Sequence, residues 1–224
     1  NPANGCLGTT EYGLEEITAM RRSEGKNAAA YLGAQYHESI VNDIEVLYTI
    51  GLLRKITAKV REIQPDVMLL LSLEDYMEDH MNASKLGSTA AFCRGMPNFI
   101  TDPDRAPYSK EVAVYHAMPI GLEYMTSKRP VPDFFINIEG VIDKKEKMLS
   151  MHKSQKNWLD KSQGINSYLE NMKDLGKDAG AMSTVFLYAE GWRKHNHLGF
   201  CSEHARPLED TLHDYVYYSM EKGG

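Results

Sequence analysis

Long apolar runs, basic blocks and paired cysteines are all missing from this sequence. No run approaches the roughly 18 apolar residues that a membrane-spanning helix needs. Basic residues cluster in nothing larger than pairs and the formal net charge is −6, so nucleic acid and anionic membranes are poor candidate partners. The 3 cysteines lie far apart without a C-x-x-C pair, which excludes a disulfide framework and a zinc ribbon. Free thiols of this kind are typical of a reducing compartment, so we expect a cytoplasmic protein.

The composition that is present fits one globular domain. Of the 224 residues, 42% are hydrophobic and 25% are charged, which is enough to bury a sizeable core. No stretch rich in glycine, serine and proline divides the sequence, so we expect a single domain over residues 1–224. The chain opens at Asn1 without a methionine, which is compatible with a processed or incomplete product.

The spacing of apolar residues predicts an α/β fold. Apolar residues recur at threes and fours over residues 14–32, which a glycine closes, and over residues 50–63, which a proline ends. Val67–Leu71 is then a continuous apolar run, typical of a strand that helices bury on both faces. The helical pattern resumes over residues 83–93. Helix, turn, strand and helix form half of a parallel unit, so we expect a Rossmann-like, mostly parallel sheet flanked by helices.

The rest of the chain adds elements, but its start lacks one. Residues 112–116 and 133–138 are rich in β-branched and aromatic residues and predict two more strands, and Pro207–Met220 predicts a terminal helix. A parallel sheet normally begins with a central strand of its own, yet no apolar strand precedes Asn4. We therefore expect the first strand of the sheet to be missing from this chain.

An acidic crest with one histidine follows the apolar strand directly. Open α/β sheets bind ligands at the carboxyl ends of their strands, which is where these side chains should lie. A catalytic zinc usually needs three protein ligands and an open position, so one histidine among carboxylates is a weak signal by itself. The alternative is an acidic first turn of the next helix, where carboxylates oppose the positive end of the helix dipole. The crest consists of Glu74, Asp75, Glu78, Asp79 and His80.

The other histidines stand singly, apart from one alternating pair. We expect the single histidines to be solvated or hydrogen-bonded rather than metal ligands; they are His37, His116, His152 and His213. His195 and His197 would face one side of an extended segment, so a metal role is open, although a surface pair is the favoured interpretation. A weaker hypothesis combines His80 and Asp75 with one of these two histidines in a rebuilt metal site.

Four segments resemble, in the expected order, the LmbE-like (PIG-L) family of N-acetylglucosaminyl deacetylases. Asn4–Gly8 is similar to the family's N/R-G-x-x-G loop, and Arg21–Leu32 to its following R-x-x-E helix. Pro65-Asp66-Val67, with Asp79-His80 after the strand, resembles its second signature, and Tyr188–Trp192 its later Y-A-E-x-F segment.

The resemblance implies a zinc-dependent amidase that removes an acetyl group from an amino sugar. It implies that His80 is a metal ligand, that Asp79 is a catalytic carboxylate that orients a neighbouring group, and that Arg21 binds substrate hydroxyls. The implied partner is a small-molecule amino sugar or glycoconjugate, and a homo-oligomer is compatible with the family.

Two departures from the family pattern qualify this expectation. The A-H-P-D-D signature, which supplies two metal ligands and the general base, is absent and should stand upstream of Asn4. Met77 replaces the leading histidine of H-P-D-H, and a thioether cannot donate a hydrogen bond to an oxyanion. The leading hypothesis is an enzyme whose N-terminal segment is missing here. The alternative is a non-catalytic sugar-binding protein on the same fold that has lost its metal site.

Overall fold

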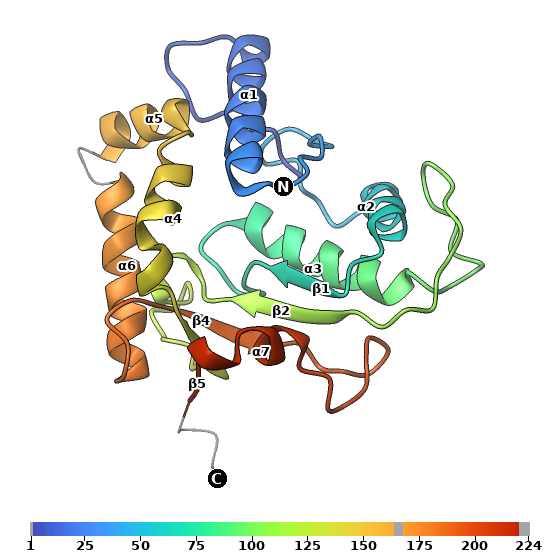
Figure 1. Ribbon diagram of the computed structural model, residues 1–224. Coiled ribbons are helices and arrows are strands. Elements are labelled where there is room, and N and C mark those ends of the chain that lie inside the picture. The colour runs from blue at the N-terminus through green and yellow to red at the C-terminus, as the bar shows by residue number, and fades with distance from the viewer. Residues whose placement is uncertain (1, 164–167, 220–224) are drawn as a thin grey trace. The chain divides into compact units, whose positions relative to one another are not determined.

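The computed structural model describes residues 2–163 and 168–219, and the chain forms two compact units (Figure 1). The first unit comprises Asn1–Glu45 and Asn137–Ala189, and the second comprises Val46–Ile136 and Glu190–Gly224. The expectation of a single domain over residues 1–224 stays a prediction.

The first unit is built from helices. Helix α1 (Leu14–Leu32) begins after Gly13 with two glutamates in its first turn, and it ends at Gly33, whose φ of 69° is the left-handed conformation that favours glycine. It packs against α4 (Ile142–Leu149) and α5 (Lys153–Gln163), and these in turn contact α6 (Tyr168–Ser183). A short 3₁₀ turn, η2 (Glu139–Val141), precedes α4. The helix predicted over residues 14–32 is confirmed.

The second unit carries a five-stranded sheet of order β1-β2-β4-β3-β5. Its strands are β1 (Val67–Leu70), β2 (Ala113–Ala117), β3 (Phe134–Asn137), β4 (Ala189–Lys194) and β5 (Val216–Tyr218). Strand β1 runs parallel to β2, whereas β2 and β4, and likewise β3 and β5, are antiparallel. The α/β class with helices beside a sheet is thus confirmed, and the structure refines the mostly parallel sheet to a mixed one. Strand direction depends on the connections, which apolar patterning does not reveal.

Helices cover both faces of this sheet. Helices α2 (Ile50–Ile63) and α3 (Glu78–Cys93) pack against each other, and α3 contacts β1. The short α7 (Pro207–Thr211) lies on the opposite face (Figure 1). Adjacent residues of a strand point to opposite faces of the sheet. On β2, Tyr115 donates a hydrogen bond to Glu209 of α7, whereas His116 lies against Ser84 of α3, so α7 and α3 cover opposite faces. One apolar cluster under α3 joins Ala91, Val112, Val114 and Phe200.

Two expectations about the second unit are wrong. Strand β1 stands at one end of the strand order and is not buried on both faces, since Leu69 is 52% exposed. The helix predicted over Pro207–Met220 ends at Thr211. A 3₁₀ turn, η3 (His213–Tyr215), and strand β5 replace its remainder as far as Ser219, and Met220 lies outside the described residues. Pairing with β3 outweighs the helical spacing there, because Val216, Tyr217 and Tyr218 are strand-favouring types. None of the helices in the described ranges is long and apolar enough to span a bilayer.

Candidate active site

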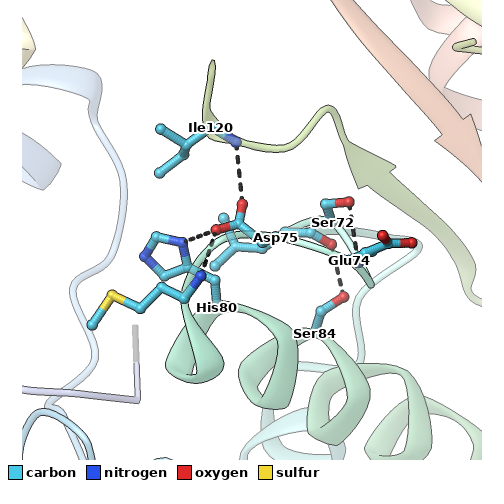
Figure 2. Close-up of polar contacts among 8 residues, drawn as sticks. Ser72, Glu74, Asp75, His80, Ser84 and Ile120 are labelled. Atoms are coloured by element: carbon cyan, nitrogen blue, oxygen red, sulfur yellow. Dashed lines mark hydrogen bonds and ion pairs between the residues drawn. The ribbon is translucent and has the colours of Figure 1, made fainter. Parts of the chain in front are cut away.

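The crest is organised by a buried carboxylate, that of Asp75, which is 1% exposed. Figure 2 shows this carboxylate between the loop that follows β1 and the loop that follows β2. One oxygen accepts a hydrogen bond from the backbone of Met77 at 3.3 Å and lies 2.9 Å from His80 Nδ1. The other oxygen accepts from the backbone of Ile120 at 3.1 Å. Three chain segments therefore converge on one side chain.

This contact fixes the orientation of the His80 ring. A carboxylate accepts, so Nδ1 carries the hydrogen and Nε2 of the neutral ring is an acceptor. Nε2 makes no hydrogen bond with any residue in the described part of the chain. Tyr76 lies edge-on to the ring at a centroid distance of 5.5 Å. A carboxylate behind one imidazole nitrogen, with the other nitrogen open, is the arrangement that orients metal-ligating histidines.

The remaining crest residues divide between the two interpretations. Glu78 is exposed in the first turn of α3, where it opposes the helix dipole as the alternative reading expects. Asp79 follows it in the same turn but is buried. The resemblance implied that Asp79 orients a neighbouring group, whereas the carboxylate in contact with His80 is that of Asp75. The catalytic role of Asp79 stays a prediction.

A second polar cluster, which the sequence did not reveal, lies under α3. His116 on β2 is 3% exposed, and of the two expected states, solvated or hydrogen-bonded, it takes the second. Its Nδ1 donates to the carbonyl of Leu71 at 2.9 Å, and its Nε2 accepts from His195 Nδ1 at 2.8 Å. Ser84 also donates to the Leu71 carbonyl at 2.7 Å.

Burial keeps both of these histidines neutral. It lowers the pKa of His116 to about 4 and also lowers the pKa of His195. The positive charge of Arg193, which stands opposite His116 in the β2–β4 register, acts on His116 in the same direction. His195, which directly follows β4 and is half-buried, is thus a hydrogen-bond partner of His116.

Arg21 lies in the first unit, where it braces the N-terminal loop. Its two terminal nitrogens donate to the carbonyls of Gly5 and Gly8, and burial lowers its pKa. The Asp43 carboxylate accepts from the backbone of Gly5 at 2.9 Å and of Leu7 at 3.0 Å. A cavity of about 900 Å³ in this unit is lined by Arg21 among others. Substrate binding by Arg21 stays a prediction.

The metal site implied by the resemblance is only partly represented. His80 fits one ligand position, because its Nε2 is open and Asp75 orients its ring. Within residues 2–163 and 168–219, however, no three His, Cys, Asp or Glu side chains form a group that could hold a metal ion. The rebuilt site from His80, Asp75 and either His195 or His197 is therefore not formed. The described residues do not fit a complete zinc centre.

Residues 3–91 match the family model of the PIG-L proteins, described as GlcNAc-PI de-N-acetylase. The match covers the N-terminal loop, α1, α2, β1 and the crest up to most of α3. The resemblance to the PIG-L (LmbE-like) family is thereby confirmed. No curated protein sequence gives a significant match to the chain.

Solved structures with this fold include deacetylases and one hydratase. The N,N'-diacetylchitobiose deacetylase from Pyrococcus horikoshii aligns with a TM-score of 0.66 and 21% identity, over 94% of this chain and 75% of its own. The 4-carboxy-2-hydroxymuconate hydratase GalB from Pseudomonas putida KT2440 gives 0.66 and 21%, over 89% and 79%. The antibiotic A40926 pseudoaglycone deacetylase Dbv21 gives 0.54 and 16%, over 80% and 72%. At these identities the likeness shows a shared fold.

Proposed function

We propose that the protein is a metal-dependent hydrolase that removes an N-acetyl group from an amino-sugar or glycoconjugate substrate. The observation that carries the proposal is the Asp75–His80 pair. It stands after β1, inside the segment that matches a de-N-acetylase family, and it leaves His80 Nε2 open. We assign zinc as the metal, with His80 as one of its ligands, Asp79 as a catalytic carboxylate and Arg21 as a substrate-binding residue.

Support for this assignment comes from the family match and from two structural neighbours, a diacetylchitobiose deacetylase and a pseudoaglycone deacetylase. All three cysteines are free, which agrees with the proposed cytoplasmic location. The A-H-P-D-D segment would supply the ligands that the described residues lack. We propose that the active form takes its remaining metal ligands from residues other than those described, and that it forms a homo-oligomer.

Acetate release and bound metal test the enzyme directly. The chain is purified as given and, separately, with any coding sequence that precedes Asn1. Bound zinc is measured by plasma mass spectrometry, and acetate release is measured from N-acetylglucosamine and diacetylchitobiose. We expect zinc binding and acetate release in the longer form, and His80→Ala should abolish both. His213→Ala, which changes an exposed histidine, is the control. A longer form with neither metal nor activity refutes the proposal.

A non-catalytic sugar-binding protein is the second candidate. Its support is the absence of a three-ligand group among the described residues together with Met77 at the position of a hydrogen-bond donor in relatives. This function predicts that the 224-residue chain binds amino sugars in the presence of a chelator and releases no acetate. Loss of binding on chelation would contradict it.

A further inference from the structure

Arg193 on β4 is a cation whose partners in the described structure are all uncharged. One terminal nitrogen donates to the Tyr124 hydroxyl at 2.5 Å and the other to the Ser72 hydroxyl at 2.8 Å. The guanidinium carbon also lies 5.6 Å from the centre of the Tyr124 ring. Its Nε is buried without a hydrogen-bond partner. No carboxylate among the described residues lies within ion-pair distance of Arg193.

Four other arginines of the second unit are compensated in one of two ways. Arg105 and Arg129 are exposed and pair with the carboxylates of Glu62 and Glu123. Arg61 and Arg94 are buried, and each donates to four backbone carbonyls.

Arg193 follows neither pattern, because two hydroxyl groups are its only acceptors among the described residues. An anion stabilises a partly buried guanidinium with unused donors, because it supplies the missing hydrogen-bond acceptors. No acidic side chain among the described residues therefore neutralises this positive charge.

The same two loops hold Arg193 and the Asp75–His80 pair. The loop after β1 contributes Ser72 to Arg193 and contains Asp75 three residues later. The loop after β2 contributes the Ile120 backbone to Asp75 and the Tyr124 side chain to Arg193. Both loops leave the carboxyl ends of the parallel strands β1 and β2, the edge at which open α/β sheets bind ligands.

We propose that Arg193 binds an anionic group of the substrate, so that the protein acts on acetylated amino sugars that carry a carboxylate or a phosphate rather than on neutral ones. A guanidinium presents a planar fork of donors that matches either anion. Tyr124 and Ser72 hold that fork in place, and the anion occupies the donors that they leave. This inference rests on the proposed function only for the acetylated amino sugar, since the anion preference can be measured as binding.

Calorimetric binding of three sugars tests the anion preference. The probes are N-acetylglucosamine, N-acetylmuramic acid, which adds a carboxylate, and N-acetylglucosamine 6-phosphate. We expect wild-type protein to bind at least one of the two anionic sugars about tenfold or more tightly than the neutral one, as a charge-assisted bidentate contact allows. Which of the two binds better distinguishes the carboxylate from the phosphate. Equal affinity for all three, or no binding of either anion, overturns the inference.

Variants then locate the preference. Arg193→Gln should abolish it and Arg193→Lys should retain part of it, because lysine keeps the charge but not the fork. Arg129→Gln, in the loop after β2 that also contributes Tyr124, is the matched control, and it should behave as wild type. An anion preference that survives in folded Arg193→Gln protein refutes the assignment to Arg193. If that variant does not fold, the comparison of the three sugars on wild-type protein and the Arg193→Lys result still decide.

Acetate release from the same three sugars separates this inference from the proposed function. Binding with anion preference but without acetate release leaves the inference standing and counts against the deacetylase. Acetate release at equal efficiency from neutral and anionic sugars supports the deacetylase and counts against the anion preference.

Discussion

Mild acid should destabilise the second unit through one buried histidine, His116. In the folded protein its Nδ1 hydrogen is donated to the Leu71 carbonyl and its Nε2 accepts from His195. Both ring nitrogens are thus committed in the neutral form. Protonation would remove the acceptor that His195 needs and place a cation beside Arg193 at a position that is 3% exposed.

The sign and size of the effect follow from the lowered pKa. Burial brings the pKa of His116 from 6.5 to about 4. Above pH 6.5 neither state binds the proton, and the group contributes nothing to the pH dependence. Between about pH 6.5 and 4 the unfolded chain binds the proton and the folded chain does not. As the pH is lowered through this range, the free energy of unfolding should therefore decrease by up to about 1.4 kcal/mol per pH unit. The total loss at pH 4 should be about 3 kcal/mol.

Urea denaturation at a series of pH values between 4.5 and 7.5 measures this slope. His116→Gln removes the titration while its amide oxygen can still accept from His195. The variant should be less stable near neutrality by on the order of 1–2 kcal/mol, yet it should lose less stability on acidification than wild type. His213→Gln makes the same change at an exposed position and should keep the wild-type slope. If His116→Gln and wild type show parallel pH profiles, the buried neutral histidine is not the cause.

Three further predictions concern the braced loop, the buried carboxylate and a tight glycine. Arg21→Ala removes the donors to two loop carbonyls and should cost about 2 kcal/mol, with faster proteolysis of residues 4–12 as the readout. Asp75→Asn should cost about 1–3 kcal/mol in urea denaturation, because the amide keeps one acceptor oxygen where the carboxylate offers two oxygens to three donors. Glu74→Gln on the exposed part of the same loop should stay within about 0.5 kcal/mol. Gly180→Ala would place a methyl group 2.5 Å from a backbone oxygen and should lower the melting temperature. At Gly51 the added methyl group would have no other heavy atom within 4 Å, so Gly51→Ala should raise the melting temperature slightly.

Local signals in the sequence were sufficient for the helices over residues 14–32, 50–63 and 83–93 and for the strand before the crest. The helix over residues 50–63 is confirmed at both ends, because its amphipathic stripe is bounded by a Thr49 cap and by Gln64 in a left-handed conformation. The same local signals failed at residues 212–218, where alternate tyrosines could serve a helix or a strand. Pairing with β3 decided the outcome, and that partner lies some 80 residues earlier in the chain.

The candidate site was predictable only where its members are close in sequence. Asp75 and His80 are five residues apart and were singled out together. His116 and His195 are 79 residues apart and meet only because β2 and β4 pair antiparallel. Arg193 joins them through the same register. The spacing of residues within one strand does not indicate which residues of another strand lie beside it. This polar cluster could therefore not be predicted from the sequence.

The burial of Asp75 separates the two interpretations of the crest. An acidic first turn that only opposes a helix dipole needs exposed carboxylates, and Glu78 already provides one. A carboxylate at 1% exposure carries a desolvation penalty, which its donors from Met77, Ile120 and His80 offset. Because two of these donors are backbone groups of the loops themselves, the orientation of His80 is built into the fold of the second unit. It does not depend on a bound metal. The same preformed histidine would therefore serve an enzyme that acquires its remaining ligands from another segment, and it would persist in a binding protein that has lost them.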